Sequence, residues 1–207
     1  HLLALDARRR PDERRQRAMT RYYLDAGAGG LAVGVHSTQF AIREAGLYEP
    51  VLQLAMRTAQ DWEPLGGRRP LFMVAGVAGR TDQAVREAQV ARGLGYHGAL
   101  LSLGAMKGAG EDELIEHCRA VAAVMPVVGF YLQPAVGGIH LPTTFWRRLA
   151  DIENVVAIKM APFNRYRTLD VIRGVVAAGA EDRVTLYTGN DDHIVLDLLA
   201  PFALVRD

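Results

Sequence analysis

A lysine in an apolar segment is the first residue whose type and setting suggest chemistry. Of the 24 Lys and Arg residues in the 207-residue chain, two are lysines, Lys107 and Lys159. Lys107 lies in the Gly- and Ala-rich stretch GAMKGAG, where we expect a solvated loop, whereas Lys159 lies within VVAIKM. An ammonium group is normally excluded from apolar surroundings unless it is paired or used. Lys159 is therefore the leading candidate for a functional residue.

A lysine amine in apolar surroundings can attack a ketone or aldehyde and form a Schiff base. Its ordinary pKa is about 10.4, and burial lowers that pKa because it disfavours the charged form. The alternative is that Lys159 extends into solvent or pairs with an acidic residue. The local pattern leaves both possibilities open.

Tyr131 closes the apolar run that precedes Lys159 and is its expected partner. A phenol at this position could donate and accept protons as the carbinolamine forms and collapses. Taken alone, a tyrosine at a strand end is more often a packing residue with a satisfied hydroxyl.

The elements that must position these groups follow from six apolar runs. They read as strands buried on both faces, because they are β-branched and nearly continuous. The runs are GLAVGV (30–35), PLFMVAGV (70–77), GALLSL (98–103), PVVGFYL (126–132), VVAIKM (155–160) and VTLYTG (184–189). Amphipathic stretches between them predict helices, with start and stop signals near 11–27, 81–95, 111–124 and 168–178.

The strands recur with a near-constant spacing. Counted from their first or second apolar residues, they begin at positions 31, 71, 99, 127, 155 and 184, so every interval after the first is nearly equal. One strand plus one helix per period indicates repeated βα units. An opening strand, HLLAL (1–5), would make seven, and a (β/α)8 TIM barrel needs eight strands and typically about 250 residues. We therefore predict a single α/β barrel domain over 1–207, truncated near the eighth strand, for which 200–207 remains.

The chain starts at His1 rather than Met, without a basic and apolar leader, so we expect a portion of a longer protein that is incomplete at both ends. A doubly wound open sheet is the rival architecture. It usually has a Gly-rich turn after its first strand, whereas the glycines at 27, 29 and 30 precede a strand.

In a parallel barrel the active site lies at the carboxyl ends of the strands. The residues that follow the second and seventh predicted strands are therefore candidate substrate ligands: His36, Ser37, Thr38, Gly189, Asn190 and Asp191. Asp191 and Asp192 could instead cap the next helix. A metal site built from these two acids and His193 is disfavoured, since consecutive residues seldom converge on one ion.

These segments together resemble the dihydrodipicolinate synthase and N-acetylneuraminate lyase family of class I aldolases. FYLQP, with Tyr131 and Pro134, resembles its fifth-strand Y-x-x-P motif, and VVAIKM resembles its sixth-strand lysine motif, at the interval from the tyrosine that the family shows. LDAGAGGLAVG, AGVAGRTDQAVREAQVARGLGYHGALL and LYTGNDD extend the likeness over nearly the whole chain. The resemblance implies that Lys159 forms an imine and that Tyr131 relays protons. It also implies a homo-oligomer, a dimer or tetramer.

Three departures separate the chain from a strict dihydrodipicolinate synthase. The family's G-T-T-G-E turn, which binds the substrate carboxylate, is replaced by a turn with Val35 at the first threonine position. Val136 stands where an arginine usually follows the motif proline, and the fourth-strand turn reads SLGAM instead of carrying an aromatic relay residue. We therefore expect a divergent member with another carbonyl substrate.

The leading hypothesis is a Schiff-base-forming lyase or aldolase that acts on a small 2-oxo acid or related carbonyl compound without a metal or other cofactor. Two alternatives stay open: a barrel that binds a metabolite without catalysis, and a metal-dependent aldolase that uses Asp191 and Asp192.

The composition excludes several classes of protein and partner. A net charge of +1 and a half-hydrophobic chain disfavour a nucleic-acid binder and a disordered tail. The longest apolar run, 120–132, is split by Pro126 and is too short to cross a membrane. The single cysteine, Cys118, cannot form an internal disulfide, so we expect a cytoplasmic protein.

Overall fold

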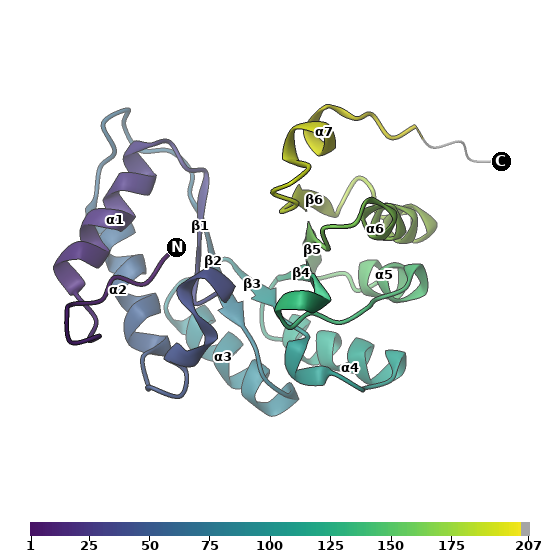
Figure 1. The fold of residues 1–207 in the computed structure, drawn as a ribbon, viewed down its shortest axis with the longest axis horizontal. Helices are drawn as coiled ribbons and strands as arrows, with labels where there is room; N and C mark the ends of the chain where they lie inside the picture. Colours follow the sequence, from purple (N-terminus) through teal and green to yellow (C-terminus); the bar gives the residue numbers. More distant parts are fainter. Residues whose placement is uncertain (204–207) are drawn as a thin grey trace. The chain divides into compact units, whose positions relative to one another are not determined.

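The computed structural model describes residues 1–203, in which helices and strands alternate along the chain (Figure 1). These residues divide into two compact units. The first contains His1–Val77 and Val85–Leu100, and the second contains Ala78–Ala84 and the chain from Leu101 onward. That the two form one domain stays a prediction.

The first unit is built from paired helices and parallel strands. Strands β1 and β2 pair in parallel, with Leu31 opposite Met73 and Val33 opposite Ala75, and helices α1 and α2 pack together. Asp12 begins α1 because its carboxylate accepts a hydrogen bond from the Arg15 N–H. The elements are α1 (Glu13–Asp25), β1 (Gly30–Val33), the 3₁₀ turns η1 (His36–Thr38) and η2 (Phe40–Ile42), α2 (Tyr48–Asp61), β2 (Phe72–Val77), α3 (Thr81–Gly93, its first turn in the second unit) and β3 (Gly98–Leu101, its last residue in the second unit).

The second unit carries three neighbouring parallel strands, β4, β5 and β6. Helices α5 and α6 pack against each other, and Phe145 and Trp146 of α5 are fully buried. Asn164 begins α6 by accepting a hydrogen bond from the Arg167 N–H. The elements are η3 (Gly104–Met106), α4 (Glu111–Ala122), β4 (Val127–Leu132), η4 (Pro134–Val136), α5 (Thr143–Ala150), β5 (Val155–Ala161), α6 (Arg165–Ala177), β6 (Thr185–Thr188) and α7 (Ile194–Leu199).

All six apolar runs form strands within their predicted ranges or one residue beyond, so the alternation of strand and helix is confirmed. The opening strand at 1–5 is wrong. This segment makes only an isolated bridge between Leu5 and Pro11, because the Gln16 side chain of α1 bonds its backbone at Leu2 and Ala4. Residues 200–203 form no strand, and 204–207 of the predicted eighth strand lie outside the described residues.

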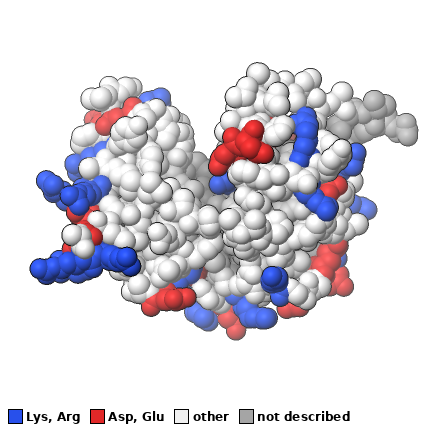
Figure 2. Space-filling model, viewed as in Figure 1, with Lys and Arg blue, Asp and Glu red and all other residues white. Residues whose placement is uncertain are grey.

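The surface carries charges of both signs (Figure 2). Lys and Arg side chains gather over the loop before α1, where Arg8, Arg9 and Arg10 are exposed. Within residues 1–203 no helix has the length and apolar character needed to span a membrane.

Candidate active site

Lys159 lies near the carboxyl end of β5, between strands β4 and β6. Its register partners are Phe130 on β4 and Tyr187 on β6, and its Nζ lies 5.1 Å from the centre of the Phe130 ring. The side chain is partly buried. Burial lowers the pKa of the amine, while the negative charge of Asp191 acts in the opposite direction. The structure therefore places Lys159 in surroundings that favour a neutral, nucleophilic amine.

Gly189 leaves the space that the Lys159 side chain occupies. A Cβ at position 189 would lie 2.8 Å from Cε of Lys159 and 3.1 Å from Cβ of Ala161. Gly189 also continues the strand ladder, since its N–H bonds to the Met160 carbonyl. Its place beside the amine supports the prediction that the turn after β6 borders the site.

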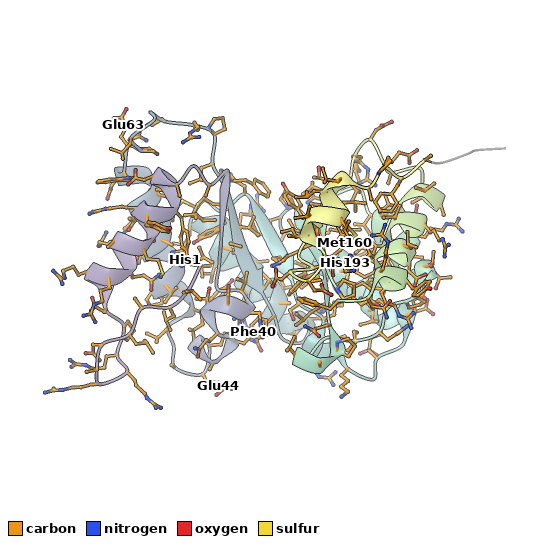
Figure 3. All side chains as sticks on the ribbon, turned by 45° about the horizontal axis from the view of Figure 1, so that its top comes forward. His1, Phe40, Glu44, Glu63, Met160 and His193 are labelled. Carbon is orange, nitrogen blue, oxygen red and sulfur yellow. The ribbon has the colours of Figure 1, made fainter. Side chains whose placement is uncertain are left out.

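Tyr131 is not beside Lys159. The two are as far apart in the sequence as Val127 and Val155, which pair where the two strands begin. A β-bulge after Val127 then shifts the register by one, so that Phe130 faces Lys159 and Tyr131 faces Met160, which is labelled in Figure 3. Because side chains alternate between the two faces of a strand, Tyr131 and Lys159 point to opposite faces of the sheet.

The surroundings of Tyr131 agree with that orientation. The side chain is 1% exposed and packs on Trp146 with ring centres 5.0 Å apart. Its hydroxyl donates to the Leu141 carbonyl and accepts from the Leu141 N–H, at 3.4 and 3.3 Å. Burial raises the pKa of this phenol. In this arrangement Tyr131 ties β4 to the segment before α5, and its role in proton transfer stays a prediction.

The side-chain amide of Asn190 is fully hydrogen-bonded within the protein. It is 3% exposed, its Nδ2 donates to Thr168 and Asp197, and its Oδ1 accepts from the N–H of Phe163 at 3.0 Å. Phe163 has a φ of 51°, a left-handed conformation that non-glycine residues seldom adopt. Asn190 thus holds the loop that follows β5, and its amide has no donor left for a substrate.

Asp191 and Asp192 are exposed in the turn after β6. The charge of Asp191 acts on the Lys159 amine, which places this carboxylate near the candidate site. Neither acid lies in a group of three or more His, Cys, Asp or Glu side chains that could hold a metal ion, as far as residues 1–203 are concerned.

The turn predicted to bind a carboxylate belongs to the first unit. His36 and Ser37 are exposed, and the first N–H groups of such a turn have no partner within it. Thr38 differs, because it is fully buried and its hydroxyl donates to the His1 carbonyl and accepts from the Gly34 N–H. The Thr38 hydroxyl is therefore committed to the fold, while His36 and Ser37 stay predicted ligands.

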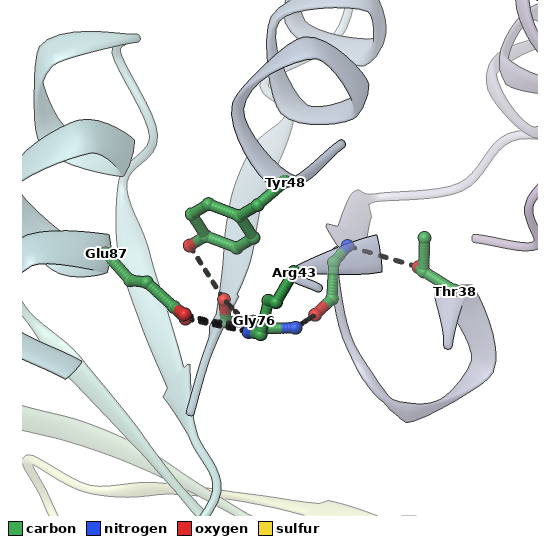
Figure 4. Close-up of polar contacts among 6 residues, drawn as sticks. Thr38, Arg43, Tyr48, Gly76 and Glu87 are labelled. Carbon is green, nitrogen blue, oxygen red and sulfur yellow. Dashed lines mark hydrogen bonds and ion pairs between the residues drawn. The ribbon is translucent and has the colours of Figure 1, made fainter. Parts of the chain in front are cut away.

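An ion pair that the sequence analysis missed fixes the strand ends beside this turn (Figure 4). Nε and NH2 of Arg43 bond the Glu87 carboxylate at 2.8 to 3.1 Å, while NH1 bonds the Gly34 carbonyl and NH2 also bonds that of Gly76. Tyr48 covers the guanidinium and donates to the Gly76 carbonyl at 2.8 Å. Nothing in the spacing of Arg43 and Glu87 distinguishes them from the other surface charges, so only the structure identifies this pair.

Residues 4–201 match the Dihydrodipicolinate synthetase family. The chain belongs to this family.

Several curated relatives of this chain carry the name 4-hydroxy-tetrahydrodipicolinate synthase. The relative from Nitratidesulfovibrio vulgaris is 29% identical over 191 residues, which cover 91% of this chain and 61% of the relative. The relative from Desulforudis audaxviator is 32% identical over 188 residues, covering 89% and 58%. This chain thus spans about three fifths of the length of these relatives.

Solved structures of the family share the fold. A prophage protein of the dihydrodipicolinic acid synthase family from E. coli K12, in complex with pyruvate, superposes with a TM-score of 0.82 at 22% identity, over 96% of this chain and 64% of that one. The dihydrodipicolinate synthase from Acinetobacter baumannii, also complexed with pyruvate, gives 0.79 at 19% identity, over 93% and 62%. The predicted barrel fold class is therefore confirmed.

Proposed function

We propose that this family chain is part of a Schiff-base-forming lyase or aldolase that acts on a small 2-oxo acid or related carbonyl compound. The observation that carries the proposal is the partly buried amine of Lys159 near the carboxyl end of a parallel strand, with Gly189 leaving room beside it. A neutral amine in such a place can attack a carbonyl carbon. The protonated imine that results draws electrons from the adjacent C–C or C–H bond, so that bond can form or break.

His36 and Ser37 are the proposed ligands of the substrate carboxylate, because both are exposed in the turn after β1. The exposed carboxylate of Asp191 is a further proposed substrate ligand. It lies near the amine, since its charge acts on Lys159. No part of this scheme uses a metal or cofactor. We further propose a cytoplasmic homo-oligomer, a dimer or tetramer, which light scattering on the purified protein would test.

The test exploits the scarcity of lysine in the chain. The protein is incubated with pyruvate, treated with borohydride and digested for peptide mass spectrometry. We expect a reduced adduct on the peptide that contains Lys159 and none in Lys159→Met. The matched control, Lys107→Met, removes the exposed lysine after η3 and should keep the adduct.

Failure of folded protein to form an adduct with pyruvate and a panel of other 2-oxo acids and aldehydes would contradict the proposal. Binding of such a compound without an adduct, unchanged in Lys159→Met, would favour the non-catalytic, metabolite-binding alternative. Activity lost on chelation would instead favour the metal-dependent one.

A further inference from the structure

A cavity of about 260 Å³ opens in the first unit, at the amino ends of its strands. It is bordered by the last turns of α1 and α2 and by residues that lead into β1, β2 and β3, among them Ala28, Leu71 and His97. Pockets for small molecules typically hold roughly 300–1,000 Å³, so a ligand of this cavity must be small. The turn at His36 follows the opposite, carboxyl end of β1. The cavity is therefore separate from the predicted carboxylate-binding turn.

Apolar and aromatic side chains form most of the cavity wall. Leu24 and Met56 are buried and line the cavity from the core. Trp62, which follows α2, lines it with an indole ring that is held in two ways. The indole N–H donates to Asp25 at 3.0 Å, and the guanidinium carbon of Arg21 lies 4.8 Å from the ring centre. Since aromatic rings stack on one another, this wall suits a flat apolar group.

The charged side chains that line the cavity are cationic. They are Arg68 and Arg69, and no Asp or Glu side chain of residues 1–203 lines it. Arg68 donates to the Gln60 carbonyl at 3.2 Å, whereas the Arg69 guanidinium makes no hydrogen bond or ion pair with the described residues. Glu63, in the same loop, is exposed and lies outside the lining (Figure 3). The N–H donors of Arg69 are thus available to an anion.

The guanidinium of Arg69 lies on the turn after α1. A Cβ at Gly27 would lie 3.3 Å from NH1 of Arg69, and the φ of +86° at Gly27 also favours glycine. Neither α1 nor α2 has a basic residue in its last turn. Compensation of the partial negative charge at these helix ends is therefore the alternative role of Arg69.

His97 adds a further donor to the lining. Its Nδ1 accepts a hydrogen bond from the Met73 N–H at 3.0 Å, and its ring stacks on Phe72 with ring centres 5.9 Å apart. A neutral imidazole that accepts at Nδ1 carries its proton at Nε2. That N–H makes no hydrogen bond with the described residues. The cavity thus combines an apolar wall with unpaired donors.

We propose that this cavity is a second ligand site, which binds a small organic anion made of a carboxylate or phosphate group on a flat apolar body. Arg69 pairs with the anionic group, because the guanidinium fork matches the oxygens of carboxylates and phosphates. Trp62 and Met56 contact the apolar body. The inference does not involve Lys159, so it stands independently of the proposed function.

Benzoate and phenyl phosphate are the probes. Each joins an anionic group to a flat ring, and neither has the ketone or aldehyde that a lysine imine requires. Tryptophan fluorescence of the whole protein follows binding. Of the two tryptophans, Trp62 lines the cavity and Trp146 is fully buried in the second unit. We expect a saturable change with a Kd of about 1 mM or tighter for at least one probe, and the tighter of the two identifies the anionic group.

Two sets of compounds test the two parts of the ligand. Benzamide keeps the ring but has no charge, and acetate and inorganic phosphate keep the charge but have no ring. Each should bind at least about 10-fold more weakly than the tighter probe, because it lacks either the charge-assisted hydrogen bonds or the apolar contact.

The variants test the residues. Arg69→Met should weaken binding of the tighter probe by about 10- to 100-fold, the usual effect of losing hydrogen bonds to a charged group. The matched control, Arg57→Met, removes an exposed arginine of α2 that lies outside the cavity and should bind as the wild type does. Ala59→Leu fills part of the cavity without changing its charge and should also weaken binding. Thermal denaturation checks that each variant is folded.

The inference is overturned if neither probe binds to folded wild-type protein, or if benzamide binds as tightly as benzoate. It is also overturned if Arg69→Met lowers the Tm but keeps the wild-type affinity, since the arginine then serves only the helix ends. If Arg69→Met does not fold, Ala59→Leu decides the question, and wild-type affinity in that variant would contradict the assigned site.

Discussion

Replacing Arg43 with methionine should strongly destabilise the protein. The guanidinium and the Glu87 carboxylate form a nearly buried pair, with side chains 11% and 9% exposed and a shortest separation of 2.8 Å. The substitution removes the cation from a buried carboxylate and a hydrogen-bond donor from each of the Gly34 and Gly76 carbonyls. Breaking a buried pair in this way costs about 3–5 kcal/mol, a large part of the roughly 5–15 kcal/mol of a typical domain.

Urea denaturation measures this loss. With a slope of about 1–3 kcal/mol per molar urea, we expect the midpoint of the Arg43→Met transition to fall by about 1–5 M at an unchanged slope. Arg43→Lys should recover only part of the loss, because an ammonium cannot reproduce the forked contacts of the guanidinium. The double variant with Glu87→Met should be more stable than Arg43→Met alone, since it also removes the buried carboxylate.

The reasoning is refuted if Arg43→Met unfolds within about 1 kcal/mol of the wild type, the range of an exposed ion pair. It is also refuted if the two substitutions are additive, because residues that interact should show a coupling energy. A confirmed coupling would establish that the strand ends before the His36 turn depend on this pair.

Three further predictions concern the second unit. Gly189→Ala should slow adduct formation with pyruvate by up to about 10²-fold, measured by timed borohydride trapping, because its Cβ displaces the end of Lys159; a large loss of stability would contradict this reason. Asn190→Ala removes three side-chain hydrogen bonds, one buried and two part-buried, including that to the strained Phe163 backbone, and should lower the calorimetric Tm by about 5–10 °C; an unchanged Tm would show that these bonds contribute nothing. Burial lowers the pKa of His117, so the unfolded state binds the extra proton first and stability should fall as the pH drops below about 6.5; denaturation at pH 7.5 and 5.5 should give a smaller difference in His117→Gln, and an equal difference would refute it.

Much of the fold could be predicted from the sequence, because the decisive signals are local. A strand buried on both faces shows a continuous β-branched run in the sequence. Each such run can be recognised from its own residues, without knowledge of the rest of the fold. The exception at 1–5 is an apolar segment whose backbone bonds to Gln16, a contact that composition does not reveal.

The candidate site was predictable only in part. The sequence by itself singled out Lys159, since one of only two lysines lies within an apolar run and can be recognised without the structure. It also located the turns after β1 and β6, but not which of their polar groups are already used. Thr38 and Asn190 look like ligands in the sequence, and only their hydrogen bonds reveal that they hold backbone instead.

The faces of the sheet to which Tyr131 and Tyr187 point were decided by tertiary structure alone. Tyr131 and Tyr187 lie equally far before and after Lys159 along the chain, so their spacing cannot distinguish them. The bulge near Val127 shifts one pairing by a single residue, while the pairing with β6 stays regular. Since side chains alternate with a period of two, that one-residue shift moves a tyrosine to the other face of the sheet.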